Sequence, residues 1–153
     1  MRSRLAAGIA AAALVPALLA GCGGGESEEK PGSEKQRYIE QSDAICRDAF
    51  SQASGIGSGR DRASAQKGID VWTAASDKLK PIPIPRESEE LAKQFVTDVE
   101  NLSLAYTQAE RSAELNDQTD VDEAYRDVDM IKKRAAETAD KYGYEVCKDI
   151  DRV

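Results

Sequence analysis

The chain has 153 residues, a length that fits one small domain and excludes a two-lobed solute receptor. It is 41% apolar and 32% charged but only 5% aromatic, which favours an alanine-rich helical protein over a β-sandwich. The formal net charge of −7 predicts repulsion of nucleic acids and of anionic lipid headgroups.

The sequence contains no histidine. Histidine is the commonest general base and zinc ligand, so its absence excludes most hydrolase and metalloenzyme sites. Lysine, tyrosine and the carboxylates can still act as acids or bases. We therefore expect a protein that is not an enzyme and that uses no cofactor or metal.

The first residues have the pattern of an export signal. Residues 1–4 are cationic, and residues 5–20 form an uncharged apolar run that is interrupted by Pro16. This run is shorter than the about 20 residues that a membrane-spanning helix needs, and glycines follow it instead of a basic cluster. The sequence therefore predicts a signal peptide over residues 1–21.

The run ends in Leu19-Ala20-Gly21-Cys22, which resembles the lipobox of bacterial lipoproteins at all four positions. The resemblance implies that a diacylglyceryl group is attached to the sulfur of Cys22, that the signal is removed before it, and that the new amino group is acylated. We therefore expect a lipid anchor at the extracytoplasmic face of the cell membrane. The alternative is an ordinary secreted protein with an incidental cysteine.

The stretch that follows Cys22 predicts a flexible tether. Residues 23–32 (GGGESEEKPG) contain no large apolar side chain, so they have nothing to pack into a core. Ten residues of a glycine-rich coil have an end-to-end distance of roughly 17 Å. We assign residues 22–33 to the lipidated cysteine and tether, and residues 34–153 to the folded domain.

Four helices are predicted after the tether. The first opens at Ser33 with Gln36 as the second half of a capping box, and it ends at the glycine-rich residues 54–59. The second spans about residues 61–79 with Trp72 as a core anchor. Apolar residues recur at helical spacing in both, at Tyr38, Ile39, Ile45, Cys46, Ala49, Phe50 and Ala53 and then at Ala65, Ile69, Trp72, Ala75 and Leu79.

Residues 80–85 (KPIPIP) form a stiff corner, because alternate amides lack a hydrogen. The third helix spans about residues 86–115, and the fourth begins near Thr119 or Asp120 and ends at Gly143 as a left-handed cap. Four amphipathic helices with short connections predict an all-α fold, a four-helix antiparallel bundle.

Three cysteines become an even pair once Cys22 is assigned to lipid. Cys46 and Cys147 then lie on the oxidising side of the membrane, where one disulfide between them is possible. It would tie the first helix to the residues after the fourth. A reactive thiol or a metal-binding pair is the alternative.

A second resemblance rests on Tyr38-Ile39 and Asp43-Ala44-Ile45-Cys46 near the start and on Tyr142-Gly143-Tyr144 and Val146-Cys147 at the end. These segments are similar to those of a group of small actinobacterial lipoproteins, most of them uncharacterised. The resemblance implies an all-helical fold and anchoring in the outer leaflet. It implies no activity.

Four features have a functional interpretation beside a structural one. The triad Gly55, Gly57 and Gly59 lacks the strand and spacing of a phosphate-binding loop, which favours a flexible loop. The acids Asp117, Asp120, Asp122 and Glu123 do not match a calcium loop and fit a helix start. The proline segment favours a corner over a partner-binding surface, and the aromatics Trp72, Tyr106, Tyr125, Tyr142 and Tyr144 favour core over a ligand pocket.

The leading functional hypothesis is a membrane-anchored, non-enzymatic module that binds an envelope protein or a small lipophilic ligand. A carrier with an internal apolar cavity is one alternative. An envelope enzyme that uses Glu89, Glu90 or Asp98 is the other, although these acids fit a solvated helix face.

Overall fold

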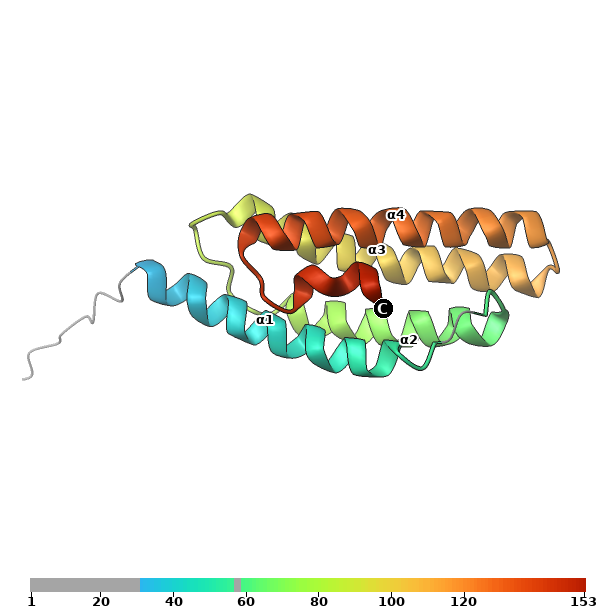
Figure 1. Ribbon diagram of the computed structural model, residues 1–153, viewed down its shortest axis with the longest axis horizontal. Coiled ribbons are helices and arrows are strands. Elements are labelled where there is room, and N and C mark those ends of the chain that lie inside the picture. Colours follow the sequence, from blue (N-terminus) through green and yellow to red (C-terminus); the bar gives the residue numbers. More distant parts are fainter. Residues whose placement is uncertain (1–30, 57–58) are drawn as a thin grey trace, which may run out of the picture.

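The computed structural model describes residues 31–56 and 59–153, and this part of the chain is all-α (Figure 1). The main helices pack antiparallel, and a short 3₁₀ helix follows them: α1 (Pro31–Ala53), α2 (Arg62–Leu79), α3 (Glu89–Glu114), α4 (Gln118–Tyr142) and η1 (Cys147–Arg152). The predicted four-helix antiparallel bundle is confirmed. The predicted signal peptide, Cys22 and most of the tether lie outside the described residues. Among the described residues, no helix is long and apolar enough to cross a membrane.

The helix ends agree with the sequence at two of the four helices. The carboxylate of Asp61 caps α2 by accepting from the backbone N–H of Ser64 at 2.7 Å, and Gly143 ends α4 with a φ of 101°. The predicted start of α1 at Ser33 was wrong, because the helix begins at Pro31, where a missing N–H has no consequence. The predicted start of α3 was early, because Ser88 has a left-handed φ of 61°.

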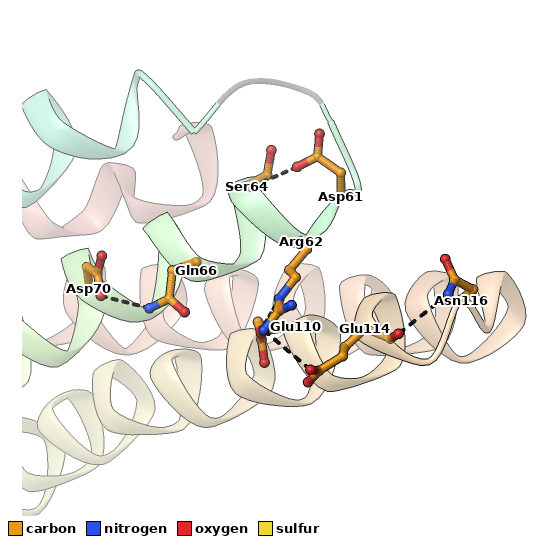
Figure 2. Close-up of polar contacts among 8 residues, drawn as sticks. All are labelled: Asp61, Arg62, Ser64, Gln66, Asp70, Glu110, Glu114 and Asn116. Carbon is orange, nitrogen blue, oxygen red and sulfur yellow. Dashed lines mark hydrogen bonds and ion pairs between the residues drawn. The ribbon is translucent and has the colours of Figure 1, made fainter.

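The centre of the bundle is the packing of α3 between α2 and α4. Gly68 lets α2 approach α3 closely, since a Cβ there would lie 2.4 Å from Cδ1 of Tyr106. At the end of the bundle where α2 begins and α3 stops, Arg62 forms ion pairs with Glu110 at 2.5 Å and with Glu114 at 3.6 Å (Figure 2). Trp72 is 1% exposed, which confirms its predicted place in the core.

The segment after α4, residues 144–153, here called the tail, separates α1 from α4. Over the described residues, α1 and α4 have no Cα atoms within 8 Å of each other, whereas η1 approaches both helices. Figure 1 shows the tail lying between the two. Its side chains Tyr144, Cys147 and Ile150 are at most 1% exposed, so the tail supplies core that the sequence analysis did not assign.

Two interactions hold the tail on α1. The predicted disulfide is present, with Cys46 and Cys147 joined by an S–S bond of 2.02 Å. One turn before Cys46, the buried carboxylate of Asp43 accepts hydrogen bonds from the backbone N–H groups of Glu145, Val146 and Cys147 at 2.9, 3.0 and 2.9 Å. Asp43 thus caps η1 from a different helix, and its charge favours the N-terminal end of that helix.

We predict that Asp43→Asn lowers the free energy of unfolding by about 2 to 3 kcal/mol, because an amide cannot accept from three N–H groups as a carboxylate does. Urea unfolding of the oxidised protein measures the change. Asp48→Asn is the matched control, since Asp48 is 68% exposed on the same helix and lies 3.8 Å from Lys78. Equal stability of the two variants would contradict the role of Asp43.

Candidate functional site

An open apolar groove lies on the outer face of α3 and α4. Its volume is about 470 Å³, and it is lined by Asn101, Leu104, Ala105, Asp127, Met130, Ile131 and Arg134. Leu104 is 61% exposed and Met130 is 62% exposed, although side chains of this kind are usually buried. We call this surface the α3–α4 groove. Exposed apolar side chains that gather in one hollow are typical of a binding surface.

An ion pair between a buried carboxylate and a half-exposed guanidinium fixes one edge of the α3–α4 groove. The carboxylate of Asp98 is 0% exposed, and its Oδ1 accepts from Nη2 and Nε of Arg134 at 2.7 and 2.8 Å. The side-chain amide of Gln94 donates to the same oxygen at 3.0 Å. Arg134 itself is 52% exposed. The buried carboxylate therefore holds a cation in a defined position at the surface.

The acids considered for an enzyme do not converge. The expectation that Asp98 lies on a solvated helix face was wrong, because α4 covers it with Arg134. Glu89 lies nine positions earlier, about 13 Å along the helix axis, and bonds to Lys93 at 2.6 Å. Glu90 is exposed. Carboxylate pairs in glycosidases lie about 5 to 9.5 Å apart, so this arrangement resembles none of them.

Two of the acids near the start of α4, Asp117 and Asp122, have structural partners. The side chain of Asp117 caps the helix by accepting from the N–H groups of Thr119 and Asp120 at 3.1 and 3.2 Å, which confirms the capping interpretation for Asp117. Asp122 pairs with Arg60 at 3.2 Å. Among the residues that the structure describes, no group of three or more histidines, cysteines or acids has an arrangement that would hold a metal ion.

The aromatic residues form core, as predicted. Trp72 and the tyrosines at 106, 125, 142 and 144 are each at most 8% exposed. At the end where α4 stops, Tyr142 and Tyr144 stack with ring centroids 4.7 Å apart, and Tyr38 meets Tyr142 edge-on at 5.8 Å. Burial raises the pKa of Tyr142 to about 12, and burial also raises the pKa of Tyr144.

The proline segment sets the corner between α2 and α3, and it also lines a hollow. This hollow has a volume of about 310 Å³ and is lined by Glu34, Arg37, Tyr38, Gln41, Pro83, Ile84 and Pro85. It lies against the first turns of α1, at the end where α4 stops. A smaller hollow of about 160 Å³ lies beyond the end of the tail, where Tyr106 and Tyr125 contribute to its wall.

The α3–α4 groove was not predicted from the sequence. Leu104 and Met130 each stand two positions after a buried residue, Leu102 and Val128, so they point away from the core-facing side of their helices. Apolar residues outside the stripe were a signal for a second apolar face. The pairing of Asp98 with Arg134 had no such signal, because 36 positions separate the two residues.

Comparisons with known proteins identify no relative: no family model, no curated protein and no solved structure matches the chain.

We predict that the tyrosines of the folded protein ionise at higher pH than free tyrosine, whose pKa is about 10. Burial raises the pKa of all five tyrosines, at 38, 106, 125, 142 and 144, to about 12 for Tyr106 and Tyr142. In the unfolded chain the pKa of tyrosine is about 10. The free energy of unfolding is therefore unaffected by tyrosine ionisation below pH 10, and it falls as the pH rises towards 12, because the unfolded chain then ionises more readily than the folded one. Absorbance at 295 nm should therefore rise together with the loss of helical circular dichroism. Ionisation of all five tyrosines near pH 10 with the helices intact would contradict the burial.

We predict that Arg134→Met lowers the free energy of unfolding by about 2 kcal/mol or more, because it leaves the buried carboxylate of Asp98 without its cation. The half-exposed position of Arg134 and the remaining bond from Gln94 keep the loss below that of a fully buried pair. Lys93→Met removes the exposed pair with Glu89 and should change stability by less than about 1 kcal/mol. Thermal unfolding measures both, and the double variant Asp98→Leu with Arg134→Met should recover most of the loss.

Proposed function

We propose that this chain is a lipid-anchored protein of the extracytoplasmic membrane face, which acts without catalysis by binding a partner through the α3–α4 groove. The observation that carries the binding role is the exposure of Leu104 and Met130 in one hollow beside the fixed cation of Arg134. Binding surfaces combine an apolar centre with oriented polar groups at the edge, and this groove has both.

The support for the anchor comes from the sequence. The four residues Leu19-Ala20-Gly21-Cys22 resemble a lipobox, and the disulfide of the folded domain suits an oxidising compartment outside the cytoplasm. Two or more acyl chains on Cys22 would hold the protein firmly, since each buried methylene contributes about 0.8 kcal/mol. The negative charge of the chain argues against attachment through a basic surface.

The two alternatives have weaker support. A carrier of lipophilic ligands would need an enclosed apolar cavity, whereas the α3–α4 groove is an open surface with charged residues at its edges. An enzyme would need carboxylates that face each other across a cleft, and Asp98 is instead bonded to Arg134 and Gln94. A binding module accounts for the exposed apolar residues directly.

Photo-crosslinking in living host cells tests the proposal. A photoreactive amino acid at Leu104 of the full chain should form covalent adducts with a bound partner on illumination. Leu115 is the matched control, because it is 78% exposed near the end of α3 and does not line the groove. In the same cells, Cys22→Ser should move the protein out of the membrane fraction.

The outcomes separate the two parts of the proposal. Absence of adducts at Leu104, or the same adducts at Leu115, would overturn the binding role of the α3–α4 groove. A Cys22→Ser protein that is processed fully and still sediments with membranes would overturn the lipid anchor.

A further inference from the structure

We propose that the α3–α4 groove binds a second copy of this chain, with α4 of one copy packed antiparallel on α4 of the other. This inference rests on the proposed function, since it names the partner of the same groove. The order of charged and apolar residues along α4 and the way in which Asp98 holds Arg134 support it.

The groove residues of α4 read as a self-complementary strip. Asp127, Met130, Ile131 and Arg134 follow one another at three-, one- and three-residue steps and share one face of the helix. The midpoint between Asp127 and Arg134 is also the midpoint between Met130 and Ile131. An antiparallel partner centred there therefore places Asp127 opposite Arg134 of the second copy, and Met130 opposite Ile131.

A single register thus satisfies both kinds of contact. Two-fold symmetry repeats each pair, so a dimer gains two Asp127 to Arg134 ion pairs around an apolar centre. Leu104, which lines the same groove from α3, would add to that centre. With a different register the acid or the cation loses its partner, and with parallel helices like charges come together.

The ion pair of Asp98 with Arg134 inside each copy orients Arg134 for contact with Asp127 of the second copy. Asp98 binds the Nε and Nη2 atoms of Arg134, which leaves N–H groups on the exposed part of the guanidinium for a second carboxylate. Because Arg134 is already held, little side-chain freedom is lost when Asp127 of a second copy binds it. Asp127 is exposed, so it is accessible to such a partner.

The lipid anchor would make a small interface sufficient. The groove is formed by seven residues, so we expect weak association in dilute solution. Attachment to one membrane raises the effective concentration of the copies for each other. Because α1 starts at the end where α4 stops, an antiparallel dimer presents its two α1 starts at opposite ends (Figure 1). Both copies then reach one membrane when the α4 axes lie along its surface.

Disulfide crosslinking of the full chain in host membranes tests the dimer. With Met130→Cys, the new thiols of two copies lie next to the symmetry axis, so mild oxidation should give a dimer on a non-reducing gel. Leu115→Cys is the control for random collision, because Leu115 is exposed but lies outside the groove. Cys46 and Cys147 are paired and buried, so they do not compete for the new thiol.

A charge variant tests the register. Asp127→Lys in the Met130→Cys chain places two cations opposite each other at both symmetric positions, and it should slow dimer formation by about tenfold or more. Asp140→Lys makes the same charge change on an exposed residue of the same helix and should leave the rate unchanged.

Each outcome decides the inference. Dimers that form equally at Leu115→Cys, or that persist unchanged with Asp127→Lys, would overturn it. If Met130→Cys crosslinks only to a different protein, the second copy is excluded while the proposed function stands. If neither Met130→Cys nor the photoreactive residue at Leu104 captures anything, both fail.

Discussion

The attachment of the tail to α1 is the constraint on which the rest of this fold depends. Without it, α1 would pack on α2 and, at the end where α4 stops, on Tyr142 through Tyr38, while no Cα atoms of α1 and α4 lie within 8 Å of each other over the described residues. The disulfide closes a span of 101 positions, and in the chain-entropy model such a closure contributes about 4 to 5 kcal/mol. The carboxylate of Asp43 also orients the tail, since it accepts hydrogen bonds from three successive backbone N–H groups at the point where η1 begins.

The disulfide and the hydrogen bonds to Asp43 constrain the tail in different ways. A disulfide limits the distance between Cys46 and Cys147, but it leaves the rotation of the tail about that bond undefined. The three hydrogen bonds to Asp43 define that rotation, so that Ile150 and Tyr144 enter the core on either side of the link. A domain of this size has a limited core of its own, and here ten residues beyond the last helix complete it.

The parts of the structure that follow from local rules were predictable. Helical spacing predicted the apolar faces of α2, α3 and α4, Gly143 was predicted as the cap of α4, and the parity of the cysteines predicted the disulfide. The missed parts depend on contacts between distant residues. The spacing of Asp43 and Cys46 places both on one face of α1, which was a usable sign that the acid faces the same tail as the cysteine. No comparable sign joined Asp98 to Arg134, because 36 positions separate the two residues and they lie on different helices.

The position of the α3–α4 groove follows from the place of the tail in the bundle. The tail fills the space between α1 and α4, so the core-facing side of α4 packs on α3 and on the tail. The outer side of α4 makes no packing contact with α1. A purely solvent-exposed side would be expected to carry polar residues throughout, as the outer side of an amphipathic helix usually does. Instead it carries Met130 beside a guanidinium that a buried carboxylate holds in place. A buried charge is costly to stability, and replacing such a pair by apolar residues often stabilises a protein. The position of Asp98 is therefore better explained by the orientation that it imposes on Arg134 at the groove than by the stability of the bundle.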